Sequence, residues 1–593
     1  MSINLNILRI INEKAIENGG RIMVENMNHT IDKRPEKVHV FLASGESIIG
    51  KRGDRIEKFL RKSKSWRNND PIVGAVINGK LRELTYKIDI EVYVRPVHIS
   101  GSDGALIYRR SLTFLLAAAF EELFPNCKLI VDHSVTSGGY FCRVIDREPL
   151  NVEELEKIEN KMRSFVEQDL PFQKTQVALE DAISIFEEKG FEEKVTLLRF
   201  RQKKHLVLYQ LGKHFDYHHG YMVPSTRYLR TFGLAKAKKG FILRFPRRKA
   251  PHQLQPVPES NKLIETFMQY SDWLNRLSID SVGSLNCAIE SNRIRELILV
   301  TEALHELKIS DLATKIIEEK DHLNLILIAG PSSSGKTTSS KRLTVQLIAQ
   351  GVSPYTLELD KYFVDRDKTP RDENGEFDFE SLAALNIERL NSDLLKLSAG
   401  EAVQLPKFDF ITGQSLPGDV VKLEKGQLII MEGIHGLNPN LLPDFPAERA
   451  FRIYASCLTQ LNLDRYNRIS TTDTRLIRRI VRDARERGYS AQATINRWDS
   501  VRRGEKRHIF PFQEFADEML NSALVYELSA LKPFAEPLLR QVNYQSEEYI
   551  EANRLLSMLE WFLPLDSEMV PDNSILREFI GGSILKEFDP RHI

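Results

Sequence analysis

The sequence predicts an α/β protein with a doubly wound parallel sheet in its C-terminal half and smaller α+β domains before it. An apolar run at residues 324–329 has the character of a buried strand and passes through a glycine-rich loop into a helix-forming segment. Two further apolar runs, at residues 355–359 and 427–431, each end at an acidic residue. The first half instead mixes short alternating strand patterns with charged helical stretches, which is typical of α+β domains.

Length and composition set the broad class. A chain of 593 residues exceeds what one hydrophobic core usually serves, so we expect several domains. Its 42% hydrophobic and 28% charged residues are ordinary for a soluble protein, and a net charge of +1 predicts no global attraction to nucleic acid or membrane. The four cysteines form no CxxC pair, which fits a reducing compartment and gives no zinc-site spacing. Since we find no signal-peptide pattern and no long apolar stretch, we expect a cytoplasmic protein without membrane contact.

The front half predicts two α+β domains. The first, at residues 1–98, contains a strand, a short helix and a pair of strands, which we place at 37–42, 56–61, 72–77 and 88–94, with a hairpin-like turn at Asn78-Gly79 joining the last two. The second, at residues 99–247, contains an amphipathic helix opened by Arg110. A linker and helical connector at 248–320 leads into the domain at 321–593.

The loop after the first buried strand has the spacing GxxxxGK[ST]. It consists of Gly330, Pro331, Ser332, Ser333, Ser334, Gly335, Lys336, Thr337 and Thr338. Glycines let backbone N–H groups turn inward around a polyphosphate, Lys336 can reach the β and γ phosphates, and the Thr337 hydroxyl can bind Mg²⁺. A Gly/Ser loop can match this spacing by chance, but the strand before it and the helix after it favour a phosphate-binding loop. We therefore expect ATP and Mg²⁺ as ligands.

Two acidic residues follow the other buried strands. Residues at the carboxyl ends of parallel strands face the ligand crevice, which places Asp360 and Glu432 near the phosphates. Asp360 can accept the proton of an attacking hydroxyl and help to hold Mg²⁺, although an Asp at this junction can also be only a helix cap. Glu432 ends a strand of Walker B type and is a candidate metal ligand.

An arginine-rich helix is predicted from Asp473 to Gly488. Between residues 465 and 507 there are twelve arginines and one lysine against five acidic residues. The helical spacing puts several guanidinium groups on one face, from Arg475, Arg478 or Arg479, Arg482 and Arg485. We interpret this face as neutralising the charge of the transferring phosphoryl group. A nucleic-acid backbone as the partner and a solvated helix face remain alternatives.

These segments in this order closely resemble the uridine kinase and phosphoribulokinase family. The resemblance covers about residues 322–530 and rests on GPSSSGKTT, LDKYF, FDFESL, LPKFDF, IIMEGIHGL, DTRLIRRIVRDARERG and FADEMLNSAL. It implies ATP-dependent phosphorylation of a sugar hydroxyl, with Asp360 as base, Asp378 on the ribose hydroxyls, and a lid bearing arginines from Arg475 to Arg487. The base pocket departs from the uridine kinase pattern, because Gly413 and Ser415 replace its histidine and arginine. Aromatic side chains could still stack on a base: Tyr362, Phe408 and Phe410.

The front half resembles threonyl-tRNA synthetases. The stretch IVGAVINGKLREL resembles their ubiquitin-like TGS domain, and DYHHGYMVPST lies in a region that resembles the editing domain of threonyl- and alanyl-tRNA synthetases. The positions that match the editing motifs are Arg110, Phe114, His218 and Met222. Three of these four side chains cannot transfer a proton near neutral pH. We therefore expect a scaffold that has lost its active site.

Our leading hypothesis is ATP-dependent phosphoryl transfer to the 5′-hydroxyl of a nucleoside whose base is read loosely. The alternatives are a phosphoribulokinase-like sugar kinase and an RNA-associated P-loop NTPase in which the synthetase-like module contacts RNA. An acid at position 360 favours transfer over simple hydrolysis. We expect a small-molecule nucleoside or sugar as substrate and a homo-oligomeric protein.

Overall fold

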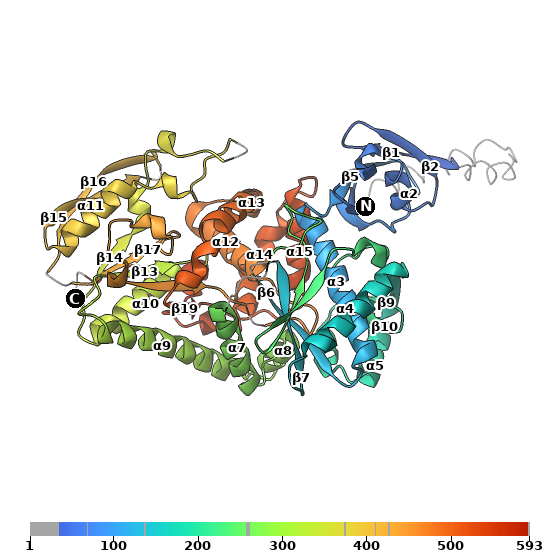
Figure 1. Cartoon of the computed structure of the whole chain (residues 1–593), viewed down its shortest axis with the longest axis horizontal. Coiled ribbons are helices and arrows are strands. Elements are labelled where there is room, and N and C mark those ends of the chain that lie inside the picture. Colours follow the sequence, from blue (N-terminus) through green and yellow to red (C-terminus); the bar gives the residue numbers. More distant parts are fainter. Residues whose placement is uncertain are drawn as a thin grey trace, which may run out of the picture. The chain divides into compact units, whose positions relative to one another are not determined.

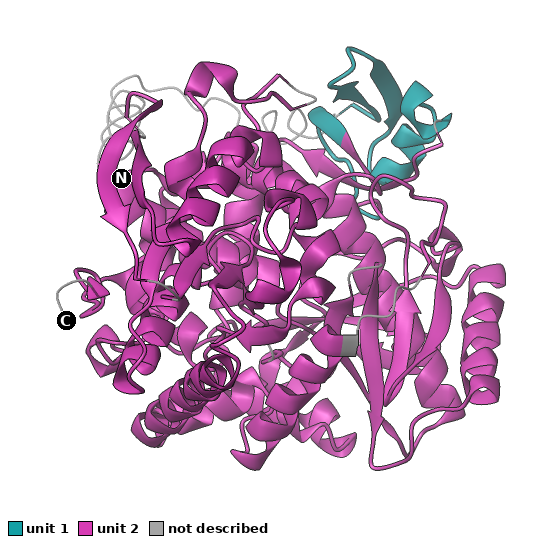
Figure 2. Cartoon of the chain, turned by 60° about the vertical axis from the view of Figure 1, so that its left-hand side comes forward, with its two compact units in different colours: residues 1–67, 85–95 teal, residues 68–84, 96–593 magenta. Residues whose placement is uncertain are grey.

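The computed structural model describes residues 35–67, 69–135, 138–256, 261–372, 375–409, 411–424, 427–459 and 461–590. Figure 2 shows that the chain divides into two compact units, residues 1–67 with 85–95, and residues 68–84 with 96–593. The boundaries predicted at residues 98, 247 and 320 stay a prediction.

The first unit contains two antiparallel strands, β1 (Lys37–Leu42) and β2 (Ser47–Lys51). The alternating Val38, Val40 and Leu42 are buried as the sequence pattern predicts. Strand β5 (Val92–His98) begins in this unit and runs parallel to β1. The helix α2 (Ile56–Leu60) buries Ile56, Phe59 and Leu60, so this small unit has a core of its own.

The second unit begins with a hairpin of β3 (Ile72–Ile77) and β4 (Lys80–Glu83). Its turn residues Asn78 and Gly79 have φ of 47° and 78°, the left-handed pair that a two-residue hairpin turn requires. The prediction that this turn leads into a strand at 88–94 is wrong. The chain forms the short strand β4 first, because a two-residue turn pairs the residues immediately beside it.

A long buried helix, α3 (Ser102–Leu123), is central to the front part of the second unit and begins eight residues before the predicted start at Arg110. Two antiparallel sheets accompany it, in the orders β11-β12-β7-β6 and β10-β9-β8. Their strands are β6 (Lys128–Val135), β7 (Gly139–Ile145), β8 (Gln173–Ala178), β9 (His205–Leu211), β10 (His214–Asp216), β11 (Gly233–Ala237) and β12 (Gly240–Arg244). The helices here are α4 (Val152–Glu167), α5 (Leu179–Glu188) and α6 (Glu192–Arg199).

Three helices form the predicted connector, and Figure 1 shows them in green: α7 (Asn261–Arg276), α8 (Val282–Glu290) and α9 (Ile294–Glu318). The last turns of α9 bury Ile309, Leu312 and Ile316 in one hydrophobic cluster with Leu343 and Leu347 of the following helix. The connector is therefore part of the packing of the C-terminal half.

The C-terminal half contains a five-stranded parallel sheet in the order β14-β17-β13-β18-β19. Along the central strand, Leu325 and Leu327 enter a core with α11, whereas Ile326 and Ile328 enter another with α9 and α10. Helices therefore cover both faces, and the doubly wound α/β fold predicted from the sequence is confirmed. The elements are β13 (Leu325–Ala329), α10 (Lys336–Ala349), β14 (Tyr355–Glu358), α11 (Ile387–Ser398), β17 (Ile429–Glu432), β18 (Ala450–Ser456) and β19 (Glu518–Asn521).

An antiparallel hairpin and a group of helices complete this half. The hairpin pairs β15 (Ala402–Asp409) with β16 (Gln414–Lys422). The helices are α12 (Thr471–Arg487), α13 (Ala491–His508), α14 (Glu527–Arg540), α15 (Glu548–Leu559) and α16 (Arg577–Ile580). Among the described residues, no helix is both long and apolar enough to cross a lipid bilayer.

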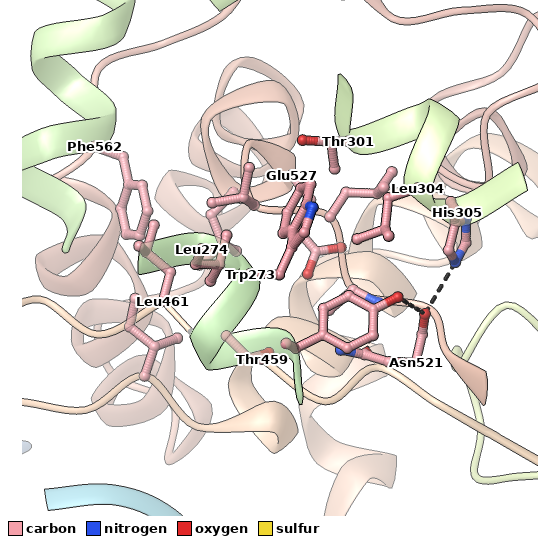
Figure 3. Close-up of a pocket in the computed structure, with 16 residues that line it drawn as sticks. Trp273, Leu274, Thr301, Leu304, His305, Thr459, Leu461, Asn521, Glu527 and Phe562 are labelled. Atoms are coloured by element: carbon pink, nitrogen blue, oxygen red, sulfur yellow. Dashed lines mark hydrogen bonds between the residues drawn. The ribbon is translucent and has the colours of Figure 1, made fainter. Parts of the chain in front are cut away.

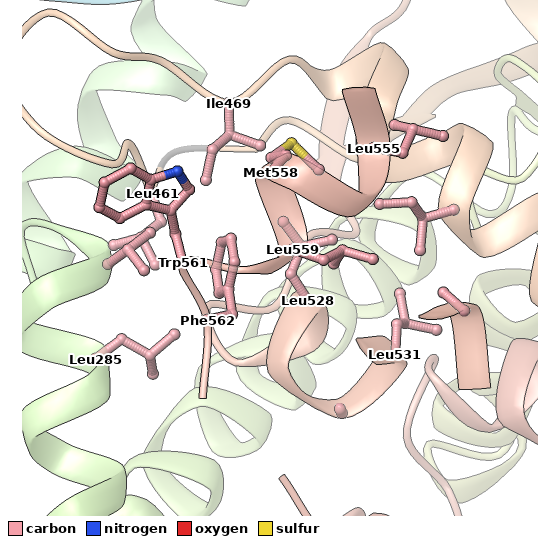
Figure 4. Packing of buried hydrophobic residues seen from close by; sticks show 14 of the residues in the cluster. Leu285, Leu461, Ile469, Leu528, Leu531, Leu555, Met558, Leu559, Trp561 and Phe562 are labelled. Atoms are coloured by element: carbon pink, nitrogen blue, oxygen red, sulfur yellow. The ribbon is translucent and has the colours of Figure 1, made fainter. Parts of the chain in front are cut away.

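The synthetase-like part and the kinase-like part share one hydrophobic core. Figure 4 shows Leu285 of α8 near Trp561 and Phe562, which follow α15, and the same cluster includes Leu197 and Leu198 of α6. At the same junction the fully buried Lys194 pairs with Asp216 at 3.0 Å and with Asp464 at 3.1 Å. Burial raises the pKa of Asp464, but Lys194 and hydrogen bonds from neighbouring groups bring it well below its usual value. This ion cluster ties the two parts together through groups that water cannot solvate.

Candidate functional site

The phosphate-binding loop joins β13 to α10 at the carboxyl edge of the parallel sheet. A side chain at Gly330 would place its Cβ 1.9 Å from the carbonyl oxygen of Ala455, so only glycine fits against β18. Ser333 and Gly335 have φ of 58° and 81°, the left-handed values that turn successive N–H groups toward one point. The hydroxyl oxygens of Ser333 and Ser334 are buried without a hydrogen-bond partner among the described residues. An anion with several oxygen atoms fits this loop.

Lys336 is the first residue of α10 and leans back on its own loop. Its Nζ donates a hydrogen bond to the carbonyl oxygen of Pro331 at 3.2 Å. Burial lowers its pKa, and the nearby carboxylates of Glu432, Glu578 and Asp360 oppose that effect. The lysine therefore stands among negative groups at the position where the motif places a phosphate ligand.

Thr337 and Glu432 meet beside Lys336, as predicted for two candidate metal ligands. The Thr337 hydroxyl donates to Oε1 of Glu432 at 2.8 Å. Burial raises the pKa of Glu432 to about 7, with Lys336 acting in the opposite direction and Asp360 in the same direction. Carboxylates that repel each other in a partly buried site fit a divalent cation. Among the described residues no group of three or more His, Cys, Asp or Glu side chains could hold a metal, but Mg²⁺ in kinases needs only one or two carboxylates besides phosphate oxygens.

Asp360 lies two residues beyond the end of β14, within a short 3-10 turn from Leu359 to Tyr362. Its side chain is open to solvent. The surrounding protein desolvates the carboxylate and so raises its pKa, while the positive charge of Lys336 has the opposite effect. The N-cap position of the turn belongs to Glu358. The Asp360 carboxylate is therefore open to contact with a ligand beside Lys336. Asp360 does not occupy the N-cap position, so the alternative that it only caps a helix is not supported.

Two of the predicted arginines hold the loop through its backbone carbonyl groups. Arg475 pairs with Glu505, and its Nε donates to the carbonyl oxygen of Ser332 at 2.9 Å. Arg478 pairs with Glu527, and its Nη2 donates to the carbonyl oxygen of Ser522 at 2.8 Å. Both guanidinium groups are fully buried. Their charges are already balanced by carboxylates, so their contribution is to hold the loop in shape.

The other arginines of α12 lie nearer the surface. Arg479 donates to the Ser332 hydroxyl at 3.0 Å and pairs with Asp483 at 3.2 Å. Arg482 pairs with the same carboxylate at 3.1 Å. Arg487 pairs with it as well, at 3.3 Å. Because three arginines share one carboxylate, this group keeps a net positive charge beside the loop. Arg479 is the predicted arginine that reaches a side chain of the motif.

The carboxylate of Glu527 also borders an enclosed, mostly apolar pocket between α7, α9 and the segment after β19. Figure 3 shows Trp273, Leu274 and Phe562 among its walls and the hydrogen bond of His305 to the carbonyl oxygen of Asn521. None of the loop residues 330–338 lines this pocket. We assign the phosphate-binding loop, not this pocket, as the candidate active site, because the chemical groups gather at the loop.

Two residues of α13 that the sequence reasoning missed lie close to acidic residues of the segment that contains Asp378. His508 lies 3.8 Å from the Asp378 carboxylate, and Arg503 pairs with Asp372 at 2.9 Å. Burial raises the pKa of the neighbouring Glu380 to about 6. The local excess of basic residues up to position 507 was the signal that could have pointed to this helix.

The aromatic residues expected to stack on a base are packed into the protein. Tyr362 is 1% exposed and donates its hydroxyl to Asp393, and Phe408 is 9% exposed and packs against Phe363. Phe410 lies outside the described residues. Phe379 is the ring that stays open, with 39% exposure, and it meets Phe363 edge to face. It is a further residue that sequence reasoning missed.

The two altered base-reading positions lie at the tip of the β15–β16 hairpin. Gly413 has a φ of 74°, and a Cβ built there would lie 2.8 Å from atoms of the Arg366 side chain. The backbone N–H of Arg366 donates to the carbonyl oxygen of Gly413, and that of Ser415 donates to the Asp365 carboxylate. An arginine from the preceding loop thus fills the space that a side chain at position 413 would use.

The four editing-motif positions are packed closely. Phe114 is fully buried, and its ring meets that of His218 at 5.4 Å between centroids. Arg110 donates to the carbonyl oxygen of Tyr221 at 2.7 Å, and the buried Met222 lies next along the chain. Burial brings the pKa of His218 well below its usual value. The absence of deacylation activity stays a prediction.

Comparison with known proteins gives a different result for each half. Residues 325–526 match the model of the Phosphoribulokinase / Uridine kinase family. A solved structure described as a possible uridine kinase from Bacillus stearothermophilus is 27% identical, over 22% of this chain and 70% of that chain, with a TM-score of 0.19. The N-terminal region is similar to threonine–tRNA ligases.

Two of these ligases illustrate the extent of the similarity. The ligase of Carboxydothermus hydrogenoformans is 35% identical over 27% of this chain and 25% of its own length. That of Clostridium kluyveri is 30% identical over 34% of this chain and 31% of its own length. The chain therefore spans about a quarter to a third of the length of the curated relatives it matches. The C-terminal region carries a domain of the Phosphoribulokinase / Uridine kinase family, fused to an N-terminal region homologous to threonine–tRNA ligases.

Proposed function

We propose that this protein transfers the γ-phosphoryl group of ATP to the 5′-hydroxyl of a nucleoside or a related ribose compound. The observation that carries the proposal is the gathering of Lys336, the Thr337–Glu432 pair and Asp360 at the carboxyl edge of neighbouring parallel strands. A phosphate ligand, a candidate metal site and a candidate base are the three parts that phosphoryl transfer needs.

In the proposed reaction, Asp360 takes the proton of the acceptor hydroxyl while the oxygen of that hydroxyl forms a bond to the γ-phosphorus of ATP. The bond from that phosphorus to the β–γ bridging oxygen breaks, and ADP leaves. The raised pKa of Asp360 suits a proton acceptor. Lys336 and Arg479 offset the negative charge that remains on the phosphates. Thr337 and Glu432 would hold Mg²⁺, which neutralises phosphate charge when bound.

On the acceptor side, we propose that Asp378, with His508 at 3.8 Å, binds the sugar hydroxyls and that the exposed ring of Phe379 stacks on a base. Gly413 and Ser415 replace the histidine and arginine of the uridine kinase pattern, and Gly413 is covered by Arg366. We therefore propose that shape and stacking, more than hydrogen bonds, select the base. Such selection discriminates by about 10- to 200-fold, whereas a hydrogen-bonding site can exceed about 10⁴-fold.

A second candidate is a base-free sugar phosphate as acceptor. The Arg366 guanidinium over Gly413 favours it, because guanidinium groups bind phosphate oxygens in pairs. A panel of uridine, cytidine, thymidine and ribose phosphates, with ADP release as the readout, separates the two candidates. Activity confined to the sugar phosphates would establish the second.

We expect Asp360→Asn to lower kcat by about 10²- to 10⁴-fold while Mg–ATP affinity stays close to that of the wild type, because the amide keeps the shape but cannot take a proton. Steady-state kinetics and nucleotide titration measure the two quantities. Asp367→Asn, in the exposed turn seven residues later, is the matched control and should leave both unchanged. A normal kcat per folded molecule in Asp360→Asn, together with a lower melting temperature, would contradict the base assignment.

A further inference from the structure

A carboxylate from the C-terminal end of the chain occupies the first turn of α10. The N-cap of this helix is Gly335, which has no side chain to accept hydrogen bonds from the first N–H groups. Oε2 of Glu578 takes the place of a capping side chain. It accepts hydrogen bonds from the backbone N–H of Thr338 at 3.3 Å and from the Thr338 hydroxyl at 2.8 Å. A negative group is stabilised here by the unpaired N–H groups and the helix dipole.

The segment that carries Glu578 is firmly packed. Ile575, Leu576 and Phe579 are fully buried, and the Ile575 side chain leaves only 2.7 Å to a Cβ built on Gly335. Arg485 of the arginine-rich helix donates to the carbonyl oxygen of Glu578 at 2.9 Å. The segment is therefore held against the loop and by α12, and the Glu578 side chain is the part that can turn.

The tail that follows is tied to the phosphate-binding helix itself. Lys341, on the second turn of α10, donates to the carbonyl oxygens of Leu585 and Lys586 at 2.7 and 2.9 Å. The C-terminal segment thus contacts α10 both at its N-terminus and one turn later. These contacts fix where the Glu578 backbone stands relative to the loop.

Thr338 is the last residue of the phosphate-binding motif, and both its N–H and its hydroxyl donate to Glu578. A carboxylate and a phosphate cannot use the same donors, and the two negative charges repel each other at this distance. We propose that Glu578 is an autoinhibitory residue that stands in for a phosphate group and must turn away before a nucleotide can bind. This inference rests on the proposed use of the loop for ATP.

The test is a titration of Mg–ATP into the full chain by calorimetry. Glu578→Gln removes the charge, and Glu578→Asp keeps the charge but shortens the reach by one methylene. We expect both to bind Mg–ATP more tightly than the wild type, with about a tenfold lower Kd for the glutamine variant, because a hydrogen bond to a charged group no longer competes. Glu587→Gln makes the same charge change on the exposed tail of the segment and should leave the Kd unchanged.

Thermal melting first establishes that each variant folds like the wild type, and the aspartate variant keeps the test open if the glutamine variant does not. A Kd that is unchanged or higher in the folded Glu578 variants overturns the inference, and a higher one makes Glu578 a nucleotide ligand instead. If the wild type binds Mg–ATP normally in that case, the proposed function stands. If no variant and no wild-type protein binds Mg–ATP, the proposed function fails and the inference with it.

Discussion

At the scale of single residues, Gly413 at the tip of the β15–β16 hairpin leaves space that another side chain fills. Gly413 adopts a left-handed backbone conformation, with φ at 74°, and the Arg366 side chain fills the space above it. The uridine kinase pattern has a histidine at this position, whereas here an arginine from another loop occupies the space beside the glycine. Restoring the histidine alone does not restore the pocket, because its space is taken.

We expect Gly413→His to destabilise the fold without creating a preference for uridine. The left-handed conformation costs a residue with a side chain about 1–3 kcal/mol, and displacing Arg366 adds to that cost. Gly351→His, at a φ of 84° with no atom within 4 Å, carries the conformational cost alone and is the matched control. Chemical denaturation and the nucleoside panel measure both effects. Equal destabilisation of the two variants would show that displacing the Arg366 side chain costs no stability.

At the scale of elements, α12 combines a structural face with a chemical one. Arg475 and Arg478 point inward to buried carboxylates, whereas Arg479 and Arg482 share Asp483 near the surface. The three-residue and four-residue spacing places these guanidinium groups close together on the helix, but their partners differ. The helix therefore anchors the phosphate-binding loop and leaves positive charge beside it.

Arg478→Ala and Arg479→Ala should separate these two contributions. Arg478→Ala leaves the buried Glu527 without its counter-ion, so we expect a loss of about 3–5 kcal/mol in the free energy of unfolding. Arg479→Ala removes a partly exposed cation, so stability should change little while kcat/KM falls by about 10²-fold or more. Denaturation curves and steady-state kinetics on both variants provide the comparison. A stable Arg478→Ala protein with reduced activity would assign Arg478 to the chemistry as well.

At the scale of the whole molecule, the synthetase-like part is joined to the kinase part by a buried ion cluster. Lys194 contributes the cation, Asp216 and Asp464 the two carboxylates, and the Tyr217 hydroxyl donates to Asp464 at 2.5 Å. The Tyr217 ring also stacks on Trp561. The N-terminal region and the C-terminal half are thus packed against each other through buried contacts.

We expect Lys194→Met to lower the free energy of unfolding by about 3–5 kcal/mol, because two buried carboxylates lose their counter-ion. Lys203→Met breaks the exposed ion pair with Glu560 across the same junction and should cost less than about 1 kcal/mol. Calorimetric unfolding measures the stability of both variants, and the kinase assay shows whether the loss of stability reaches the C-terminal half. Similar melting temperatures for the two variants would mean that the cluster does not hold the parts together.

The sequence by itself determined those features that depend on neighbours along the chain. The strand, loop and helix around Lys336 follow from an apolar run and fixed glycine spacing, and Asp360 and Glu432 follow because parallel strands end at one edge. The length of α12 and its arginine rows follow from helical periodicity. Two residues at the Asn78-Gly79 turn sufficed to identify a hairpin but not the position of its second strand.

Only the tertiary structure decided which predicted residues are open to a ligand. Periodicity places Arg475 and Arg478 on a face but says nothing of Glu505 and Glu527, which stand 30 and 49 residues away and neutralise them. Glu578 meets Thr338 across 240 residues, and Arg366 covers Gly413 from another loop. Such contacts arise from how separate elements pack, and an isolated segment carries no pattern for a partner that is distant in sequence. The physical reason is that burial and charge pairing, which set what each side chain can do, are properties of the assembled core.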